Sequence, residues 1–350
     1  MAILATEHPT LKEWADSIGP NGSPAVIVNT LEKKMPMLQD APFLESNLPT
    51  GHETTILSGL PEPTWRRLYE GIQPTKSQKV KVTDTIGNLE DTSEVDADLA
   101  DLNGNTDQYR LNEAKPHFTG MAHTLGETFF YGDTDVNPER FMGLVPRYSI
   151  LSDDEDNIGY NIIDAGGTGG DNTSIWFVNY SDQTTHMIYP KGQSKRKTGK
   201  EGESYVGITH RDMSPNGSVE LTAEDGGKYL GYQDWFKAKM GLVVRDWRYN
   251  VRIANIDKSV IANMGNENYT GPDLINEMIR AYNRIEDMDT GKNCIYVNRD
   301  VLTAIDLNIA NKKTVAAFNW GEIEGKRVRM FREIPVKLCD AILNTEERVI

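Results

Sequence analysis

Polar and apolar residues alternate along two short stretches near the beginning of the chain. Residues 53–57 form an outgoing stretch, and residues 79–83, Lys-Val-Lys-Val-Thr, form a returning one. Alternation with a period of two is typical of a β-strand with two unlike faces. The pattern predicts an extended two-stranded loop within residues 49–92.

The segment between these two strands contains the residue types that protein interfaces favour. A hairpin of this length is marginally stable alone in water, and Trp, Tyr and Arg are enriched in interface cores. We therefore expect the tip of the loop to dock on another subunit. The candidate interface residues are Trp65, Arg66, Arg67, Leu68 and Tyr69.

The segment before this loop, residues 1–48, carries too little apolar surface to fold alone. A short amphipathic stretch is followed by a turn-rich run at residues 19–24, and Pro36 and Pro42 break any longer helix. A segment of this kind becomes ordered by packing on a neighbour. We expect residues 1–48 to form an N-terminal arm.

Apolar residues at helical spacing predict one long helix over residues 105–132. The stripe consists of Leu111, Ala114, Phe118, Met121, Ala122, Leu125 and Phe129. Spacings of three and four place these side chains on one face. Asn105 is the expected cap and Gly132 the expected stop. Pro116 should kink the helix or mark its true start.

Short runs of β-branched and aromatic residues indicate mostly β-structure in the middle of the chain. The predicted strands are residues 174–178, 186–189, 241–244 and 247–253. A polar loop lies between the second and third of them, with Lys195, Arg196 and Lys197 at its tip. A basic run on such a loop is more often a mobile turn than a nucleic-acid site.

The last hundred residues predict a small α/β unit. A helix should open at Gly271 and Pro272, and a second helix should be capped by Asn298. The strands expected around them are residues 294–297, 327–331, 334–338 and 341–343.

Composition limits the classes of protein that fit. The chain has 350 residues, enough for one elaborated domain or two ordinary ones, and its 30 Gly and 16 Pro indicate many turns. The formal net charge of −15 argues against a protein that wraps nucleic acid by neutralising phosphates. A wall that merely faces packed DNA needs no such affinity, so the acidic balance is compatible with a container.

Membrane and disulfide signals are weak. No stretch reaches the roughly 18 uncharged apolar residues that a spanning helix needs, and residues 1–7 lack the regions of a signal peptide. We expect a protein of the cytoplasm that does not enter a membrane. Cys294 and Cys339 form no CxxC pair and are expected to be buried, reduced thiols.

The search for chemistry finds little. There is no GxSxG or HExxH motif, and none of the four Gly-Lys pairs is followed by Ser or Thr. Residues 84–107 hold eight acidic residues and no Lys or Arg, which predicts a solvated face rather than a metal site. His117 and His123 are six residues apart, too far in helical spacing to share a metal. We expect no catalytic residue, no metal and no cofactor.

Several strings resemble the major capsid proteins of tailed bacteriophages, especially the epsilon15-like podovirus group. They are residues 42–52 (PFLESNLPTGH), 130–133 (FYGD), 141–144 (FMGL) and 334–342 (IPVKLCDAI). The resemblance implies an α+β, HK97-like fold with an N-terminal arm, an extended loop and a spine helix. It also implies a peripheral domain over residues 93–256 and an axial domain over residues 257–350, with a return of the chain to the peripheral sheet as the alternative for part of the latter.

The same resemblance implies a structural role and its partners. The chain would form pentamers and hexamers of an icosahedral head that encloses double-stranded DNA, assembled in the host bacterial cytoplasm. Because the hairpin begins near residue 50, a separate scaffolding protein is implied, and a decoration protein is compatible. Lys76, Lys79 and Lys81 lie in the loop, but no motif identifies a cross-linking Asn, so we expect a non-covalent shell.

Two alternative functions fit parts of the pattern. A decoration or connector protein would share the structural character and would form rings or monomers instead of shells. A β-rich carbohydrate-active enzyme would explain 6 Trp and 14 Tyr as stacking platforms, although core and interface packing explains them equally well.

Overall fold

The computed structural model describes residues 34–102, 104–192, 208–223, 225–264, 271–311, 318–323 and 326–350. The expected arm before residue 34 and the basic run at residues 195–197 lie outside these residues. The described chain forms two compact units. Unit 1 comprises residues 88–125 and 208–239, and unit 2 comprises residues 34–87, 126–192 and 240–350, each apart from the gaps given above.

The centre of unit 2 is strand β6 (Asn172–Tyr180), in which every residue is buried. It pairs antiparallel with β11 (Val251–Asp257) on one side and with β12 (Lys292–Val297) on the other. Strand β5 (Ile162–Asp164) extends the sheet beyond β11, and the path beyond β12 runs through β15 (Ile334–Leu338), β14 (Lys326–Phe331) and β13 (Phe318–Ile323). A strand covered on both faces loses the polar-apolar alternation, which explains the continuous run Ile-Trp-Phe-Val.

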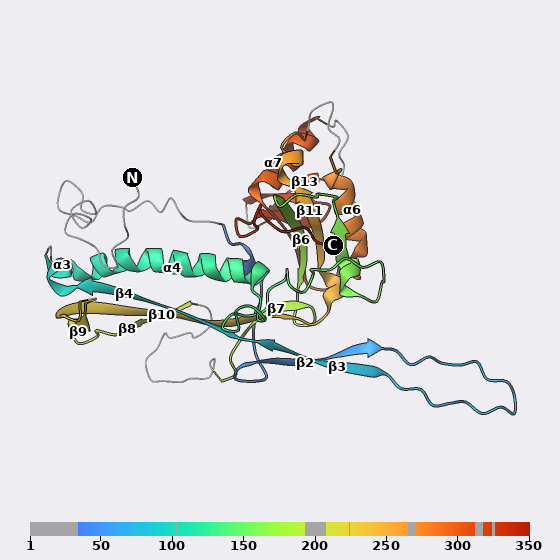
Figure 1. Ribbon diagram of the computed structural model, residues 1–350, viewed down its shortest axis with the longest axis horizontal. Coiled ribbons are helices and arrows are strands. Elements are labelled where there is room, and N and C mark those ends of the chain that lie inside the picture. The colour runs from blue at the N-terminus through green and yellow to red at the C-terminus, as the bar shows by residue number, and fades with distance from the viewer. Residues whose placement is uncertain are drawn as a thin grey trace. The chain divides into compact units, whose positions relative to one another are not determined.

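Three helices contribute to the core beside this sheet: α5 (Lys258–Ile261), α6 (Leu274–Arg284) and α7 (Arg299–Asn311). Asp273 caps α6 by accepting a hydrogen bond from the Ile275 amide, and Asn298 does the same for the Asp300 amide of α7. Leu274, Met278 and Ala281 on the apolar side of α6 belong to the same core cluster as Ile253 of β11. Figure 1 shows α6 and α7 beside the sheet.

Unit 2 also contains the extended hairpin. Strands β2 (Gly51–Gly59) and β3 (Gln78–Thr85) pair with each other as a separate two-stranded sheet. Ahead of them come the short helix α2 (Met37–Asp40) and strand β1 (Phe43–Glu45), which pairs parallel with β7 (Thr185–Tyr189). The hairpin thus begins from a segment that is already held by the body of unit 2.

Unit 1 combines a long helix with long strands (Figure 1). Its elements are α3 (Ala97–Asp101), α4 (Thr106–Tyr131), β4 (Gly87–Asp96), β8 (Ile208–Asp212), β9 (Val219–Thr222) and β10 (Lys228–Val244). The last residues of α4 and β10 and the first residue of β4 belong to unit 2. Strands β8 and β9 pair antiparallel with successive parts of β10. A small apolar cluster of Val95, Ala100 and Tyr109 joins β4, α3 and α4.

Most predicted elements are present. The hairpin strands, the long helix, the strands around residues 174–178 and 186–189, and both C-terminal helices are confirmed. The helix runs from Thr106 through Pro116 to Tyr131, so the prediction that Pro116 might mark its start is wrong. Within the helices that the structure describes, none is long and apolar enough to cross a membrane.

Other predictions are wrong in instructive ways. Residues 247–249 form the 3-10 turn η2 (Trp247–Tyr249), and β11 begins only at Val251. Residues 341–343 are a turn because Asn298 bonds the Ile342 carbonyl and removes it from any strand ladder. Strand β10 starts at Lys228, well before the predicted residue 241, because β8 and β9 supply its partners.

The domain borders implied by the resemblance stay a prediction. The two compact units divide the chain differently from these expected domains. Strand β6 pairs with β11, which ends at residue 257, and also with β12, which begins at residue 292. Strand pairing therefore joins residues from both sides of the expected border at 256/257.

Candidate subunit interface

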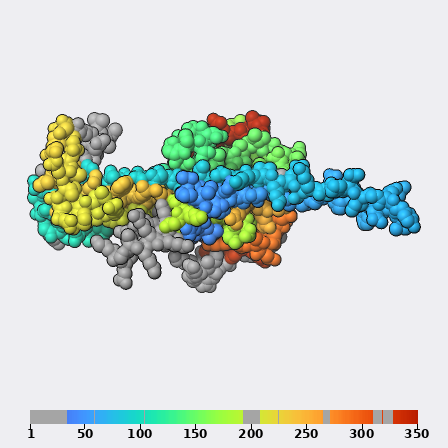
Figure 2. Space-filling view, turned by 90° about the horizontal axis from the view of Figure 1, so that it is seen from below, coloured from blue at the N-terminus to red at the C-terminus, as the bar shows by residue number. Residues whose placement is uncertain are grey.

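The loop between β2 and β3 carries the predicted interface residues, and it is exposed throughout. The side chains of Trp65 and Tyr69 are fully accessible to solvent, and Leu68 is 83% exposed. Arg66 and Arg67 are exposed as well. Figure 2 shows this loop, in light blue, projecting beyond the other segments of unit 2.

A turn near the tip presents two of these side chains. The Glu70 amide donates to the Arg67 carbonyl at 3.2 Å, which places Leu68 and Tyr69 at the corners. Tyr69 has a φ of +69°, in the left-handed region where a side chain other than that of Gly, Asn or Asp is uncommon. Tyr69 adopts this uncommon backbone conformation in the subunit although its aromatic ring lies in solvent.

Exposed apolar residues continue from the tip along both strands. They are Leu57, Leu60, Trp65, Leu68, Tyr69, Ile72 and Val80, each at least half exposed. Single exposed apolar residues are ordinary, but seven on one hairpin favour it as a candidate interaction surface. The loop also carries Arg66, Arg67 and Lys76 against Glu62 and Glu70, a small positive balance on a chain of net charge −15.

Hydrogen bonds and an ion pair hold the base of the hairpin. Asn47 and Glu53 exchange two hydrogen bonds, because the Glu53 amide donates to Asn47 Oδ1 and Asn47 Nδ2 donates to the Glu53 carbonyl. Arg147 Nη2 lies 2.7 Å from Asp84 Oδ1, and the Asp84 carboxylate is buried. Asp84 was predicted to lie on a solvated acidic face, and that prediction is wrong for this residue because Arg147 neutralises it within unit 2.

A buried carboxylate that sequence reasoning missed fastens the segment ahead of the hairpin. Asp40, at the end of α2, accepts hydrogen bonds from Lys292 Nζ at 2.7 Å, Lys337 Nζ at 2.5 Å and Tyr296 Oη at 2.9 Å. Burial alone would raise the pKa of Asp40, but these three donors lower it below 3.8. One signal in the sequence is the acidic residue inside the largely apolar run Met-Leu-Gln-Asp-Ala-Pro-Phe-Leu.

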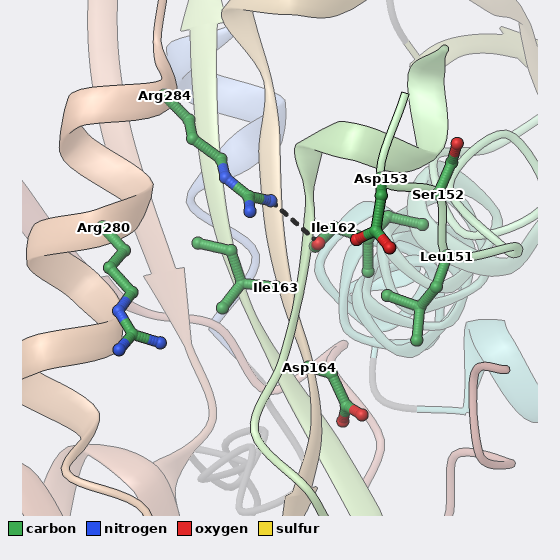
Figure 3. A pocket seen from close by; sticks show the side chains of 8 residues that line it. All are labelled: Leu151, Ser152, Asp153, Ile162, Ile163, Asp164, Arg280 and Arg284. Carbon is green, nitrogen blue, oxygen red and sulfur yellow. Dashed lines mark hydrogen bonds between the residues drawn. The ribbon is translucent and has the colours of Figure 1, made fainter. Parts of the chain in front are cut away.

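One hollow of about 300 Å³ opens on unit 2, lined by Leu151, Ser152, Asp153, Ile162, Ile163, Asp164, Arg280 and Arg284 (Figure 3). Arg284 donates to the carbonyls of Tyr160 and Ile162 and lies over the Tyr160 ring, so its charge supports the local backbone. Arg280 is engaged by Glu277 on its own helix. Among the described residues, no group of three or more His, Cys, Asp or Glu is arranged to hold a metal ion.

The elements now described define a class of protein. An extended hairpin, a long helix with long strands beside it, and a sheet flanked by two helices are combined in the HK97-like fold of phage capsid proteins. A family model for the major capsid protein GP7 matches residues 19–350, and the chain belongs to this family.

A solved structure supports the same assignment. A chain in the solved structure of bacteriophage Epsilon15 has 32% sequence identity to this protein. The alignment covers 100% of this chain and 99% of the Epsilon15 chain, with a TM-score of 0.74. The capsid of cyanophage A-1(L) has 10% identity over 66% of this chain and 96% of the cyanophage chain, with a TM-score of 0.47. The capsid of bacteriophage JBD30 has 11% identity over 91% of this chain and 99% of the JBD30 chain, with a TM-score of 0.43. No curated protein sequence matches the chain.

The chain is therefore a structural capsid protein of a phage virion that assembles into an icosahedral shell. The family match does not favour a decoration or connector protein or a carbohydrate-active enzyme.

Proposed function

We propose that the tip of the extended hairpin is the docking element with which one copy of this capsid protein holds the next. The carrying observation is that Trp65 and Tyr69 are fully exposed in the subunit. Aromatic and arginine side chains that become desolvated on binding supply much of the energy of an interface. A soluble chain gains nothing from leaving both rings in water unless a partner covers them.

The charge of the tip favours another copy of the same chain as that partner. Arg66 and Arg67 stand side by side on the loop, whereas the chain as a whole is acidic. Opposite charges on two surfaces orient an encounter and discriminate against wrong partners. The docking surface on the neighbour is accordingly expected to be acidic at its rim and apolar at its centre.

The shell itself is proposed to consist of pentamers and hexamers around double-stranded DNA. Many modest interfaces add up in a closed lattice, so no single contact has to be strong and no covalent cross-link is required. The net charge of −15 supports a wall that faces DNA without neutralising its phosphates, and no sequence-specific binding is proposed. A separate scaffolding protein, a decoration protein and assembly in the host cytoplasm complete the proposal, and no catalytic role is assigned.

We propose an assignment of the peripheral and axial domains that follows units 1 and 2. Unit 1, with the long helix and β8 to β10, would be the core of the peripheral domain. The sheet of β6, β11 and β12 with helices α6 and α7 would be the axial domain, which moves β6 and β11 out of the peripheral domain expected from the resemblance. The pairing of β6 with both β11 and β12 supports this choice.

A double substitution tests the docking element. Trp65→Ala with Arg67→Ala removes an aromatic ring and a positive charge from the tip and should leave a soluble subunit that fails to form stable particles when expressed with its scaffold. Gln73→Ala with Lys76→Ala is the matched control, because it also removes one charge from the same exposed loop. Particles are counted by negative-stain microscopy and heated to compare their stability. Normal, heat-resistant particles from the first variant would exclude the tip as the docking element.

A further inference from the structure

Two imidazoles meet where the hairpin joins the body of unit 2. His52 lies on β2 and His186 on β7, with their ring centroids 6.0 Å apart and the rings at 88° to each other. His186 is 0% exposed and His52 is 7% exposed. Nothing in the sequence connects these two histidines, because 134 positions separate His52 from His186.

The surroundings of both rings disfavour the protonated imidazole. Donors approach both nitrogens of the His52 ring, since the Asn47 amide lies 3.4 Å from Nδ1 and Arg245 lies at Nε2. Arg245 Nη2 lies 3.0 Å from His52 Nε2, and since a guanidinium can only donate, this nitrogen must accept. Both ring nitrogens of His186 are buried without a partner in hydrogen-bonding geometry among the described residues. A proton on either ring would place an uncompensated charge in the interior, which proteins tolerate poorly.

The surrounding charges add to this cost. Arg245 and Arg147 are the cations at the site, and Asp84 and Asp182 are the carboxylates that face it. Asp84 is already engaged by Arg147, so it offers little compensation. Burial and the neighbouring Arg245 outweigh the Ser181 backbone and Asp182, which favour a charged His186, and lower the pKa of His186 to about 4. Burial and Arg245 also lower the pKa of His52 below 6.5.

We propose that His52, His186 and Arg245 form an acid-sensitive latch that keeps the base of the hairpin packed on β7 and β10 at neutral pH and releases it when the imidazoles are protonated. The inference rests on the proposed function, because it regulates the position of the element that docks on a neighbour.

The direction of the effect follows from the two protonation states. In the released state the imidazoles recover an ordinary pKa near 6.5, whereas in the latched state they resist protonation. Release is therefore unaffected by pH above about 6.5 and becomes about tenfold more favourable per pH unit below it for each such imidazole. For His186 this gain ends near pH 4, where the latched form is protonated as well.

The contacts around the latch allow release without unfolding of the core. Strands β2 and β3 pair only with each other among the described strands. Besides the two rings, the base of the hairpin approaches the body at Gly241 of β10, where a Cβ would lie 2.5 Å from the Thr85 carbonyl oxygen. Separation breaks these contacts and the Asp84–Arg147 pair, but leaves the pairing of β6 with β11 and β12 intact.

Hydrogen exchange of the full chain tests the latch. Exchange is measured by mass spectrometry between pH 7 and 4, corrected for the intrinsic pH dependence of amide exchange, and the peptides at the base of the hairpin are compared with those of β6. In the wild type, protection of the hairpin base should fall relative to β6 as the pH falls below about 6.5. His186→Leu, which fills the site without a titrating group, should flatten this response. His117→Gln removes a partly exposed histidine of unit 1 and should leave the response unchanged.

Three results would overturn the latch: a wild-type hairpin base whose protection follows β6 at every pH, a full acid response in His186→Leu, or loss of the response in His117→Gln. If His186→Leu does not fold, Arg245→Met decides instead. It keeps both rings but removes the charge that disfavours protonation, so the acid response must shrink, and an unchanged response would equally refute the latch. Exchange can be followed on soluble subunits, so failure of the docking tip, scored as missing particles at neutral pH, remains a separate result.

Discussion

Arg252 and Glu346 form an ion pair inside unit 2, with Arg252 Nη2 2.8 Å from Glu346 Oε2 and both side chains almost fully buried. Ser174 and Tyr131 also donate to the Glu346 carboxylate, and Arg252 Nη1 donates to the Tyr148 carbonyl at 2.6 Å. The guanidinium lies over the Trp176 ring, 5.2 Å from its centroid. The pair thereby ties the C-terminal segment to β6 and β11 of the central sheet.

Glu346→Gln should destabilise the subunit strongly. The amide keeps the shape but leaves the Arg252 charge buried without its counter-charge, and breaking a buried pair in this way costs about 3–5 kcal/mol. Urea unfolding followed by tryptophan fluorescence measures the loss. Glu347→Gln is the control, because its side chain is exposed. Equal midpoints for the two variants would show that the ion pair does not contribute.

Asp40→Asn should loosen the segment of α2 and β1. Lys292 and Lys337 would lose the carboxylate that they share, and digestion by a protease at this segment should become faster. Because the pKa of Asp40 in the folded subunit is lowered, its carboxylate contributes fully to stability above pH 3.8, the ordinary pKa of the group. This contribution is lost as the pH falls through the lower pKa of the folded state. Asp289→Asn, an exposed residue of the same unit, should digest like the wild type.

Phe331→Ala should cost about 3–5 kcal/mol of unfolding free energy, the range for an aromatic residue removed from a core. The ring is fully buried and contacts the rings of Phe177, Tyr282 and Phe318. Thermal or urea denaturation gives the value. Ile150→Ala removes a side chain that is 71% exposed and should change stability by less than about 0.5 kcal/mol. A small loss at Phe331 would mean that the cavity collapses.

Cys294 and Cys339 should resist alkylation in the native subunit. Both are buried and free, and burial raises the pKa of Cys294 to about 11 and that of Cys339 to about 12. At pH 8 almost no thiolate is present, and the reagent cannot reach the sulfur. Mass spectrometry should find both thiols unmodified by iodoacetamide until urea is added. Ser149→Cys, at an exposed position, provides a reactive control, and rapid native labelling of Cys294 or Cys339 would contradict the burial.

Local patterns were sufficient for the elements that depend on neighbours along the chain. Alternation at residues 79–83 predicts β3, and the apolar stripe from Leu111 to Phe129 predicts α4, because each pattern repeats with the period of its own backbone. The start of β10 was missed for the opposite reason. Lys228 begins a strand only because β9 is there to pair with it.

The candidate interface divides in the same way. The sequence alone determined the shell role through its resemblance and the hairpin through its alternation. It named Trp65 and Tyr69 as interface residues through their chemistry, and that choice stays a prediction. Only the tertiary structure decided that Asp84 is buried against Arg147, that Asp40 gathers two lysines, and that His52 meets His186. Burial and charge pairing are properties of segments brought together from distant parts of the chain, and no local period encodes which segments will meet.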